Sequence, residues 1–389
     1  MLPRPLPRVA ILKSSPIAID GGGHWRGIII PAHHDAPLSL PSLHSGALRT
    51  FSRDDYLSNQ LIMATSKTVS TSRDMPRPVA TRRARFRRVA PRPMRLTADD
   101  FDIIRHVHRH RFLRSTHLLG LLNKRSGKKL LERLGALYHN GYLDRPRAQL
   151  DYYATAGSAP MVYGIGNRGA GLLAEFDGVP RAKVDWTDKN RTAGRLFIEH
   201  TLLTADLAVS FEIACRGTSD VRVIAPDDIL AGAPEATRKA LNPWALPAKI
   251  VHDGTSHDVR VIPDKVIGLD FTQARKRSYF FVEADRATMP VMRSHPRQTS
   301  FHQKILAYLA GAGAGNAHGK RLGIGNFRVL TVTTSRERME TMIAAVKLAT
   351  RGHGSNQFLF TDRASLLACP DILMLDWISG KGERVQLGA

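Results

Sequence analysis

Three carboxylates near the middle of the chain have a spacing that favours a divalent cation. Glu283 and Asp285 stand two residues apart, so a strand would place them on one face. If the polar segment 272–277 forms a turn about Gln273 and Ala274, Asp264 lies opposite Glu283 on the neighbouring strand. Like charges that face each other across a sheet are destabilising, and oxygen ligands suit Mg²⁺, Mn²⁺ or Ca²⁺. The alternative is that they are ordinary acidic residues at strand ends, with Asp285 in a surface ion pair with Arg286.

Two apolar runs must position these carboxylates. Residues 259–269 alternate apolar and polar side chains and then become continuously apolar, which predicts a first strand. Residues 279–282 are Tyr-Phe-Phe-Val, which predicts a second strand. Phe301, Ile305 and Leu309 then follow helical spacing, and that helix carries Lys304.

The chain resembles the replication-relaxation family, a group of bacterial proteins mostly associated with plasmids and mobile elements. The resemblance covers roughly residues 95–365, and its motifs are Pro263-Asp264, Glu283-x-Asp285-Arg286, and Lys304 with Tyr308 four residues later. It implies a C-terminal half like the PD-(D/E)XK nucleases, in which an Asp opens one strand and Glu-x-Lys follows on the next. Here Asp285 stands at the lysine position, and Lys304 on the following helix would replace that lysine.

The resemblance also implies a mechanism. Asp264 and Glu283 would hold Mg²⁺, with Asp285 as a further ligand, and Lys304 would orient the attacking water or steady the developing negative charge. The resulting hypothesis is a magnesium-dependent DNA nickase or endonuclease. Two alternatives remain, a non-catalytic accessory factor with a degenerate nuclease fold and a transcription regulator.

The composition favours a polyanionic partner. The 389 residues carry a formal net charge of +23, with a pI near 10.6. DNA, expected to be double-stranded, is the first candidate, since no apolar run approaches the length that spans a bilayer. The two cysteines provide no disulfide framework and suit a reducing cytoplasm. Candidate protein partners are a second copy of the chain, as a homodimer, and proteins of a relaxosome or a replication complex.

Residues 1–94 are predicted to form a disordered, Arg-rich tail. Proline, glycine and serine are frequent there, and no periodic apolar pattern persists. The end of the tail has no acidic residue between positions 77 and 95. It is interpreted as an arm that follows DNA phosphates, with Arg82, Arg83, Arg85, Arg87 and Arg88 as candidate contacts.

Residues 95–180 have the order of elements of a winged helix-turn-helix. Helices are predicted after Thr97, at Ser115 and after Ser126, followed by two strands around a polar loop and a closing helix. In that fold the third helix enters the major groove. The residues expected to contact DNA from that helix and from the loop before it are Lys124, Arg125, Lys128, Lys129 and Arg133. Arg145 and Arg147 would make the wing contacts. A solvated basic face, or a protein-binding role, is the alternative.

Three histidines alternate along the first of these helices. His106, His108 and His110 are spread around the helix axis by their spacing, because residues i and i+2 do not face each other. No Cys-x-x-Cys accompanies them. They are therefore interpreted as an ordinary basic surface.

Residues 190–389 complete an α+β or α/β chain with a restriction-endonuclease-like α-β-β-β-α-β domain. A long helix is predicted over 193–216, with His200 as a core or site residue and Glu212 as a surface residue or an extra carboxylate. A strand follows at 221–224, and residues 226–257 are expected to be irregular. After the central hairpin come the helix with Lys304, a strand at 327–332, a helix at 337–350 and a last strand at 358–360.

Overall fold

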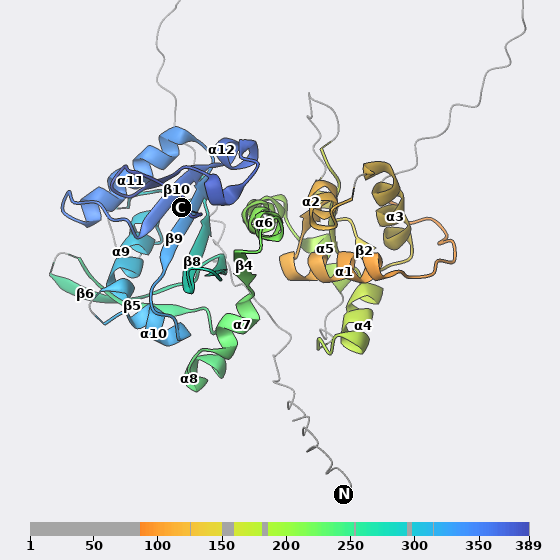
Figure 1. The fold of residues 1–389 in the computed structure, drawn as a ribbon, viewed down its shortest axis with the longest axis horizontal. Coiled ribbons are helices and arrows are strands. Elements are labelled where there is room, and N and C mark those ends of the chain that lie inside the picture. Colours follow the sequence, from red (N-terminus) through yellow and green to blue (C-terminus); the bar gives the residue numbers. More distant parts are fainter. Residues whose placement is uncertain are drawn as a thin grey trace, which may run out of the picture. The chain divides into compact units, whose positions relative to one another are not determined.

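The computed structural model describes residues 86–124, 126–149, 159–180, 186–252, 254–293, 298–313 and 315–388. The chain is a mixed α+β protein, as predicted (Figure 1). Arg82, Arg83, Arg85 and Arg125 lie outside the described residues, as do most of the predicted tail and the segment 181–185 between the two predicted domains.

The N-terminal half combines helices with a small sheet. Its elements are α1 (Ala98–His110), β1 (Leu113–Arg114), α2 (Ser115–Leu121), α3 (Gly127–His139), β2 (Leu143–Asp144), the short 3-10 helix η2 (Arg147–Gln149), β3 (Val162–Ile165) and α4 (Asn167–Phe176). The three strands pair in the order β1-β3-β2. Two of the predicted caps are confirmed: Thr97 and Asp100 form a capping box before α1, and the Ser126 side chain accepts from the backbone of Lys129. The expectation that Ser115 caps α2 is wrong, because Ser115 is the first residue of that helix and Arg114 is its N-cap.

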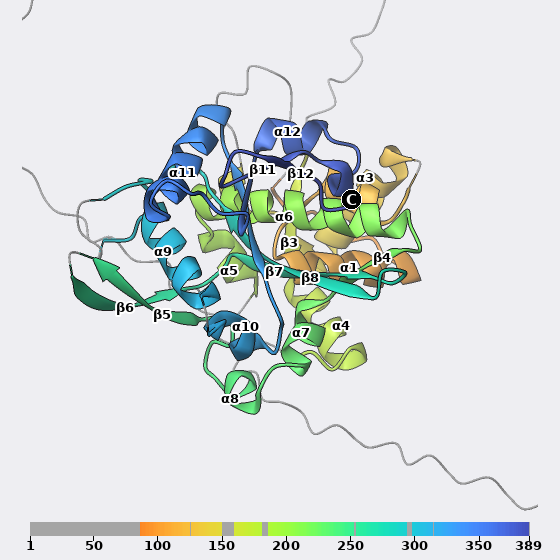
Figure 2. The same ribbon diagram turned by 60° about the vertical axis from the view of Figure 1, so that its left-hand side comes forward.

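The long helix α6 (Arg195–Arg216) follows α5 (Trp186–Thr192) and contributes to the cores of both halves. Ala205 and Val209 pack among the buried residues of the N-terminal half. Leu207 and Phe211 pack against the large sheet of the C-terminal half. Both views of the ribbon show α6 between these two sets of elements (Figures 1 and 2).

The C-terminal half is built on a seven-stranded sheet in the order β12-β11-β10-β9-β8-β7-β4. The strands are β4 (Val221–Ile224), β7 (Lys265–Phe271), β8 (Lys276–Ala284), β9 (Arg328–Thr333), β10 (Phe358–Asp362), β11 (Trp377–Ser379) and β12 (Arg384–Val385). β8, β9 and β10 are parallel neighbours, whereas β7 is antiparallel to both β4 and β8.

Helices cover both faces of this sheet. On one face α9 (Phe301–Ala312) and α11 (Arg336–Ala349) bury Phe281, Val329 and Phe358. On the other face α6, α12 (Arg363–Ala368) and the 3-10 helix η3 (Ile372–Met374) bury Phe280, Leu330 and Leu359. Successive sheet residues therefore point to opposite cores, which explains why the strands are continuously apolar in sequence.

Two of the expectations for this half are wrong. Residues 226–257 are not irregular: they form α7 (Pro226–Ala231), α8 (Glu235–Arg238), β5 (Leu246–His252) and the start of β6 (Thr255–Val261). β5 and β6 make a separate two-stranded ribbon, so Val259 and Val261 do not belong to the strand that leads into the hairpin. Pro263, which has no backbone N–H to donate to a sheet, lies in the break between β6 and β7.

A third expectation, for the end of the chain, is also wrong. β10 is not the last strand, because α12, η3, β11 and β12 follow it. The small helix α10 (Ala317–Leu322), after α9, was also not predicted. Among the described residues, no helix combines the length and the apolar character needed to cross a bilayer.

Candidate functional site

The hairpin of β7 and β8 places Asp264 opposite Glu283, as predicted. Lys265 pairs with Val282, and the Asp264 backbone N–H donates to the Val282 carbonyl over 2.9 Å. The Asp264 side chain turns towards β8, where its Oδ2 accepts from the backbone N–H of Ala284 over 2.8 Å. The strand register thus fixes two carboxylates side by side.

Helix α9 supplies both hydrogen-bond donors to the buried carboxylate of Glu283. Lys304 Nζ lies 2.5 Å from Oε2, and the Tyr308 hydroxyl donates to Oε1 over 2.5 Å. Residues four apart lie on the same face of a helix, which is why one helix reaches both oxygens. The Glu283 side chain is 3% exposed and that of Lys304 is 23% exposed, so the lysine lies at the open side of the site.

Helix α6 contributes His200, whose Nε2 lies 3.2 Å from Asp264 Oδ1. The side chains of His200 and Asp264 are 36% and 19% exposed. Of the two roles considered from the sequence, the structure favours a site residue, because the imidazole contacts a carboxylate at the partly open edge.

The charges in this cluster depend on one another. Burial would raise the pKa of Asp264, but the hydrogen bond from His200 and the charge of Lys304 outweigh it, and the pKa is lowered. Burial raises the pKa of Glu283; the charge of Lys304 opposes this without cancelling it. For Lys304, burial alone would lower the pKa, but the charges of Glu283 and Asp264 raise it above its ordinary value. Lys304 is therefore a cation that faces at least one ionised carboxylate.

Asp285 does not join Asp264 and Glu283 as a third ligand. Arg338 on α11 donates to both of its oxygens over 2.9 Å, and the Thr333 hydroxyl donates to Oδ2 over 2.7 Å. Asp285 therefore fastens α11 to the end of the sheet. The predicted alternative, an ion pair with Arg286, does not form either, since Arg286 binds Glu199 over 2.6 Å.

Asp264 and Glu283 fit a hard divalent cation by their chemistry. Both are carboxylates, they lie on neighbouring strands, and one of them is partly exposed. Each oxygen of Glu283 already accepts one hydrogen bond, from Lys304 or Tyr308, and keeps a second lone pair with which it could ligate a cation. Its neighbour Asp264 can turn Oδ1 to the cation by releasing His200.

Several residues expected to bind DNA make contacts within the protein. Arg133 binds both oxygens of buried Asp100 and also donates to the Arg95 carbonyl over 2.7 Å. The Lys124 ammonium lies 2.8 Å from Asp99. Arg133 therefore holds α3 against the start of α1.

Two further arginines stack on one tyrosine. The guanidinium groups of Arg88 and Arg145 lie 4.5 and 4.2 Å from the centroid of the Tyr138 ring. Arg88 also donates to Asp144 over 3.3 Å. The end of the predicted tail, from Arg88 onwards, thus lies against α3 and β2.

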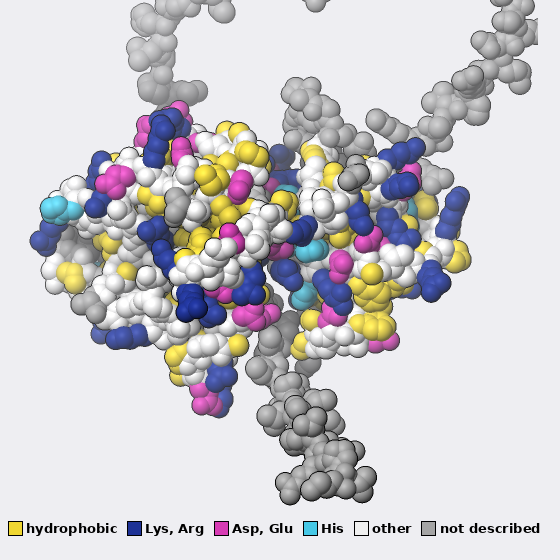
Figure 3. All heavy atoms as spheres, in the orientation of Figure 1, with side chains coloured by type: hydrophobic (Ala, Val, Ile, Leu, Met, Phe, Trp, Pro, Cys, Tyr) yellow, Lys and Arg dark blue, Asp and Glu magenta, His cyan; other side chains and the backbone are white. Residues whose placement is uncertain are grey.

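Five of the predicted DNA contacts are exposed residues, namely Arg87, Lys124, Lys128, Lys129 and Arg147. Lysine and arginine side chains are scattered over the face shown in Figure 3, with acidic side chains among them. The charge of the chain is therefore spread over both halves on this face, and the exposed lysines of α3 remain the sharpest local prediction for a DNA contact.

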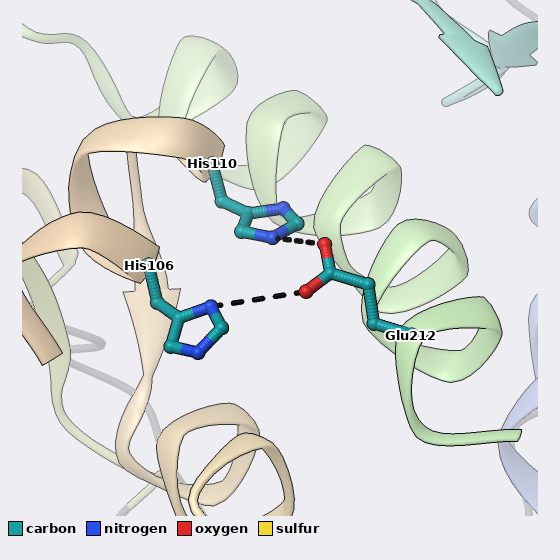
Figure 4. Close-up of side chains that lie close together, drawn as sticks. All are labelled: His106, His110 and Glu212. Atoms are coloured by element: carbon teal, nitrogen blue, oxygen red, sulfur yellow. Dashed lines mark hydrogen bonds and ion pairs between the residues drawn. The ribbon is translucent and has the colours of Figure 1, made fainter. Parts of the chain in front are cut away.

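A close group of side chains on α1 and α6 was not predicted from the sequence. Among the described residues, His106, His110 and Glu212 form the one group of three or more His, Cys, Asp or Glu side chains whose ligand atoms all lie within 4.8 Å of one another (Figure 4). His110 is fully buried, so the interpretation of these histidines as ordinary surface is wrong. The available signal was the separation of four residues between His106 and His110. His108 instead packs edge-on against Trp186.

The comparison with protein families agrees with the motifs that surround the hairpin. The family model for replication-relaxation matches residues 104–327, which is more than half of the 389-residue chain. The match includes Asp264, Glu283 and Lys304. Comparison with curated proteins and with solved structures yields no match. The chain therefore belongs to the replication-relaxation family.

Proposed function

We propose that this protein binds double-stranded DNA during replication, relaxation or transfer of a plasmid or mobile element, and nicks it at the Asp264–Glu283–Lys304 site with Mg²⁺. The observation that carries the proposal is the hairpin register, which sets Asp264 opposite Glu283 and brings Lys304 to within 2.5 Å of that glutamate. Family membership supports the setting in replication and relaxation.

The order of elements supports a nuclease-like core. Helix α6, strands β4, β7 and β8, helix α9 and strand β9 follow one another with the α7–β6 segment inserted after β4. The four strands are neighbours in the sheet, and the last pair is parallel. This order supports the proposal of an α-β-β-β-α-β core like that of the PD-(D/E)XK nucleases.

The residues of the site have separate roles in this proposal. Asp264 and Glu283 would hold Mg²⁺, which when bound polarises a phosphate and lowers the pKa of a water. Lys304 presents a positive charge at the partly open side, where it can stabilise the negative charge that develops on the phosphate. His200 holds Asp264 from α6 and limits the rotation of its carboxylate. Tyr308 holds Glu283 from the buried side.

The N-terminal half would deliver the DNA. Three helices and a three-stranded sheet in the order β1-β3-β2 support a winged helix-turn-helix. The exposed Lys128 and Lys129 would then contact the duplex from α3, and Arg147 would contact it from the wing. The arginines before Phe86 would add phosphate contacts.

A plasmid-nicking assay tests the proposal. Supercoiled plasmid incubated with the protein and Mg²⁺ should become open-circular, and EDTA should prevent this. Asp264→Asn should lower the rate by more than about a hundredfold, since even the outer-shell partners of metal ligands contribute 10- to 100-fold.

The matched control is Asp270→Asn on the same strand, where Asp270 pairs with Arg222 at a distance from the site. Asp270→Asn should nick at the wild-type rate. Equal nicking by the wild type and by Asp264→Asn would show that a contaminating nuclease, and not this site, cleaves the plasmid.

A second candidate function is a non-catalytic DNA-binding accessory factor. The observation that favours it is that Glu283 and Asp285 already have all four carboxylate oxygens engaged by donors from the protein itself. Calorimetry with Mg²⁺ separates the two functions. If the protein binds DNA but shows neither heat of Mg²⁺ binding nor Mg²⁺-dependent nicking, the accessory factor is favoured. If it still binds one defined DNA site at high salt, a transcription regulator is favoured.

A further inference from the structure

Two helices that belong to different halves meet at three side chains suited to a transition metal. His106 and His110 lie one turn apart on α1 and both present a ring nitrogen to Glu212 of α6 (Figure 4). His110 Nε2 is 2.9 Å from Oε1, and His106 Nδ1 is 3.7 Å from Oε2.

These distances suit ligands of a single ion. In a tetrahedral zinc site with bonds of about 2.0–2.1 Å, neighbouring ligand atoms lie about 3.3 Å apart. The two nitrogen–oxygen distances, 2.9 and 3.7 Å, lie on either side of that value. Small rotations of the imidazole and carboxylate groups would therefore bring the two nitrogens and one carboxylate oxygen into contact with one ion.

The surroundings provide an unsatisfied ligand and a route for entry. Among the described residues, His106 Nδ1 is buried and has no hydrogen-bond partner, although it points at the carboxylate. The side chains of His106 and Glu212 are 16% and 15% exposed, whereas that of His110 is 0% exposed. Arg109, which lies 3.5 Å from Oε2, is 51% exposed and can release the carboxylate into solvent without being buried itself.

We propose that His106, His110 and Glu212 form a binding site for one Zn²⁺ ion, with the fourth coordination position open to solvent. Two imidazole nitrogens and one carboxylate select a transition metal over Mg²⁺, which prefers oxygen ligands. The ion would fasten α1 to α6. This site shares no residue with the Asp264–Glu283–Lys304 site, so each can exist without the other.

Zinc titration of the metal-free, full-length protein tests the site. After treatment with EDTA and its removal, wild-type protein should bind one more equivalent of Zn²⁺ than either His106→Gln or Glu212→Gln, measured by calorimetry and by metal analysis. Substituted Co²⁺ should give a visible absorption band in the wild type that both variants lack. Added Zn²⁺ should also raise the melting temperature of the wild type but not of the variants.

His108→Gln is the matched control, because it lies on the same helix and contacts Trp186 instead of the site. It should bind zinc like the wild type. Circular dichroism confirms that each variant is folded before its stoichiometry is compared. Identical zinc stoichiometry in the wild type, His106→Gln and Glu212→Gln, or the absence of any zinc binding by the folded wild type, would overturn the proposal.

Discussion

Glu283 is a buried carboxylate that is stabilised by hydrogen bonds to both of its oxygens. Its side chain is 3% exposed, and each of its oxygens accepts one hydrogen bond from α9. A buried acceptor that loses its donor is left with the full penalty of desolvation. The pairing of Asp264 with Glu283 could be predicted because strands have a period of two and a polar turn fixes the register. The ion pair of Asp285 with Arg338 could not be predicted, because the two residues are 53 positions apart and no periodic pattern in the sequence connects a strand end with a distant helix.

Tyr308→Phe should lower the free energy of unfolding by about 1–3 kcal/mol, because it leaves Glu283 Oε1 without a donor. Denaturant unfolding followed by circular dichroism measures this. Tyr279→Phe, on the same strand as Glu283 and only half-buried, should change stability by less than about 0.5 kcal/mol. Equal losses in the two variants would mean that the hydroxyl of Tyr308 has no special role.

The buried thiol of Cys215 should react slowly in the native protein. Burial, with a smaller contribution from Asp371, raises the pKa of Cys215 from 9.0 to about 11. At pH 8 this shift lowers the thiolate fraction of Cys215 from about one in ten to about one in a thousand. Only the thiolate reacts with alkylating reagents. Iodoacetamide should therefore modify Cys215 at least about a hundredfold more slowly in the native protein than in the unfolded protein. Peptide mass spectrometry measures both rates, and equally fast native and unfolded labelling would contradict the buried position.

At the scale of elements, α3 presents two kinds of basic residue that look alike in sequence. Lys128 and Lys129 are exposed, whereas Arg133 reaches buried Asp100 at the start of α1. Helix positions and caps could be predicted because they depend on local periodicity and on Ser or Thr before each helix. The ribbon of β5 and β6 was missed, since Pro247 and Gly254 interrupt its pattern and the alternating Val259 and Val261 were assigned to the strand that leads into the hairpin.

Variants of α3 should separate stability from DNA binding. Arg133→Ala should lower the free energy of unfolding by about 2–3 kcal/mol, because it leaves the Asp100 carboxylate buried without its partner. The double variant Lys128→Ala, Lys129→Ala should keep its stability and lower the slope of log K against log salt by about 2. Thermal unfolding and fluorescence anisotropy with a labelled duplex provide the two readouts. An unchanged salt slope in the double variant would exclude α3 as a phosphate contact.

At the scale of the molecule, positive charge is the property most directly read from the composition. The formal net charge of +23 could be computed from the sequence, but its distribution over both halves could not, because it depends on which basic residues are used in internal pairs. Arg88, Arg133 and Arg145 are used in this way. Salt should therefore screen mainly the exposed basic side chains that are not used in internal pairs.

A chain that begins at residue 86 should keep its helical content and bind DNA more weakly. It lacks Arg82, Arg83 and Arg85, and each lost phosphate contact lowers the salt slope by about 0.9. Circular dichroism and salt-dependent anisotropy test both parts. An unaltered slope would mean that these arginines do not touch the duplex.

The position of α6 limits where the chain can be divided to make chimeric proteins. Ala205 and Val209 are needed by one core, Leu207 and Phe211 by the other, and buried Asp206 between them accepts from His117 over 2.7 Å. A chimera whose junction lies just before Arg195 would therefore separate the N-terminal half from α6 residues that form part of its own core. Chimeras that exchange the N-terminal half should fold only when the donor sequence also supplies its own copy of α6.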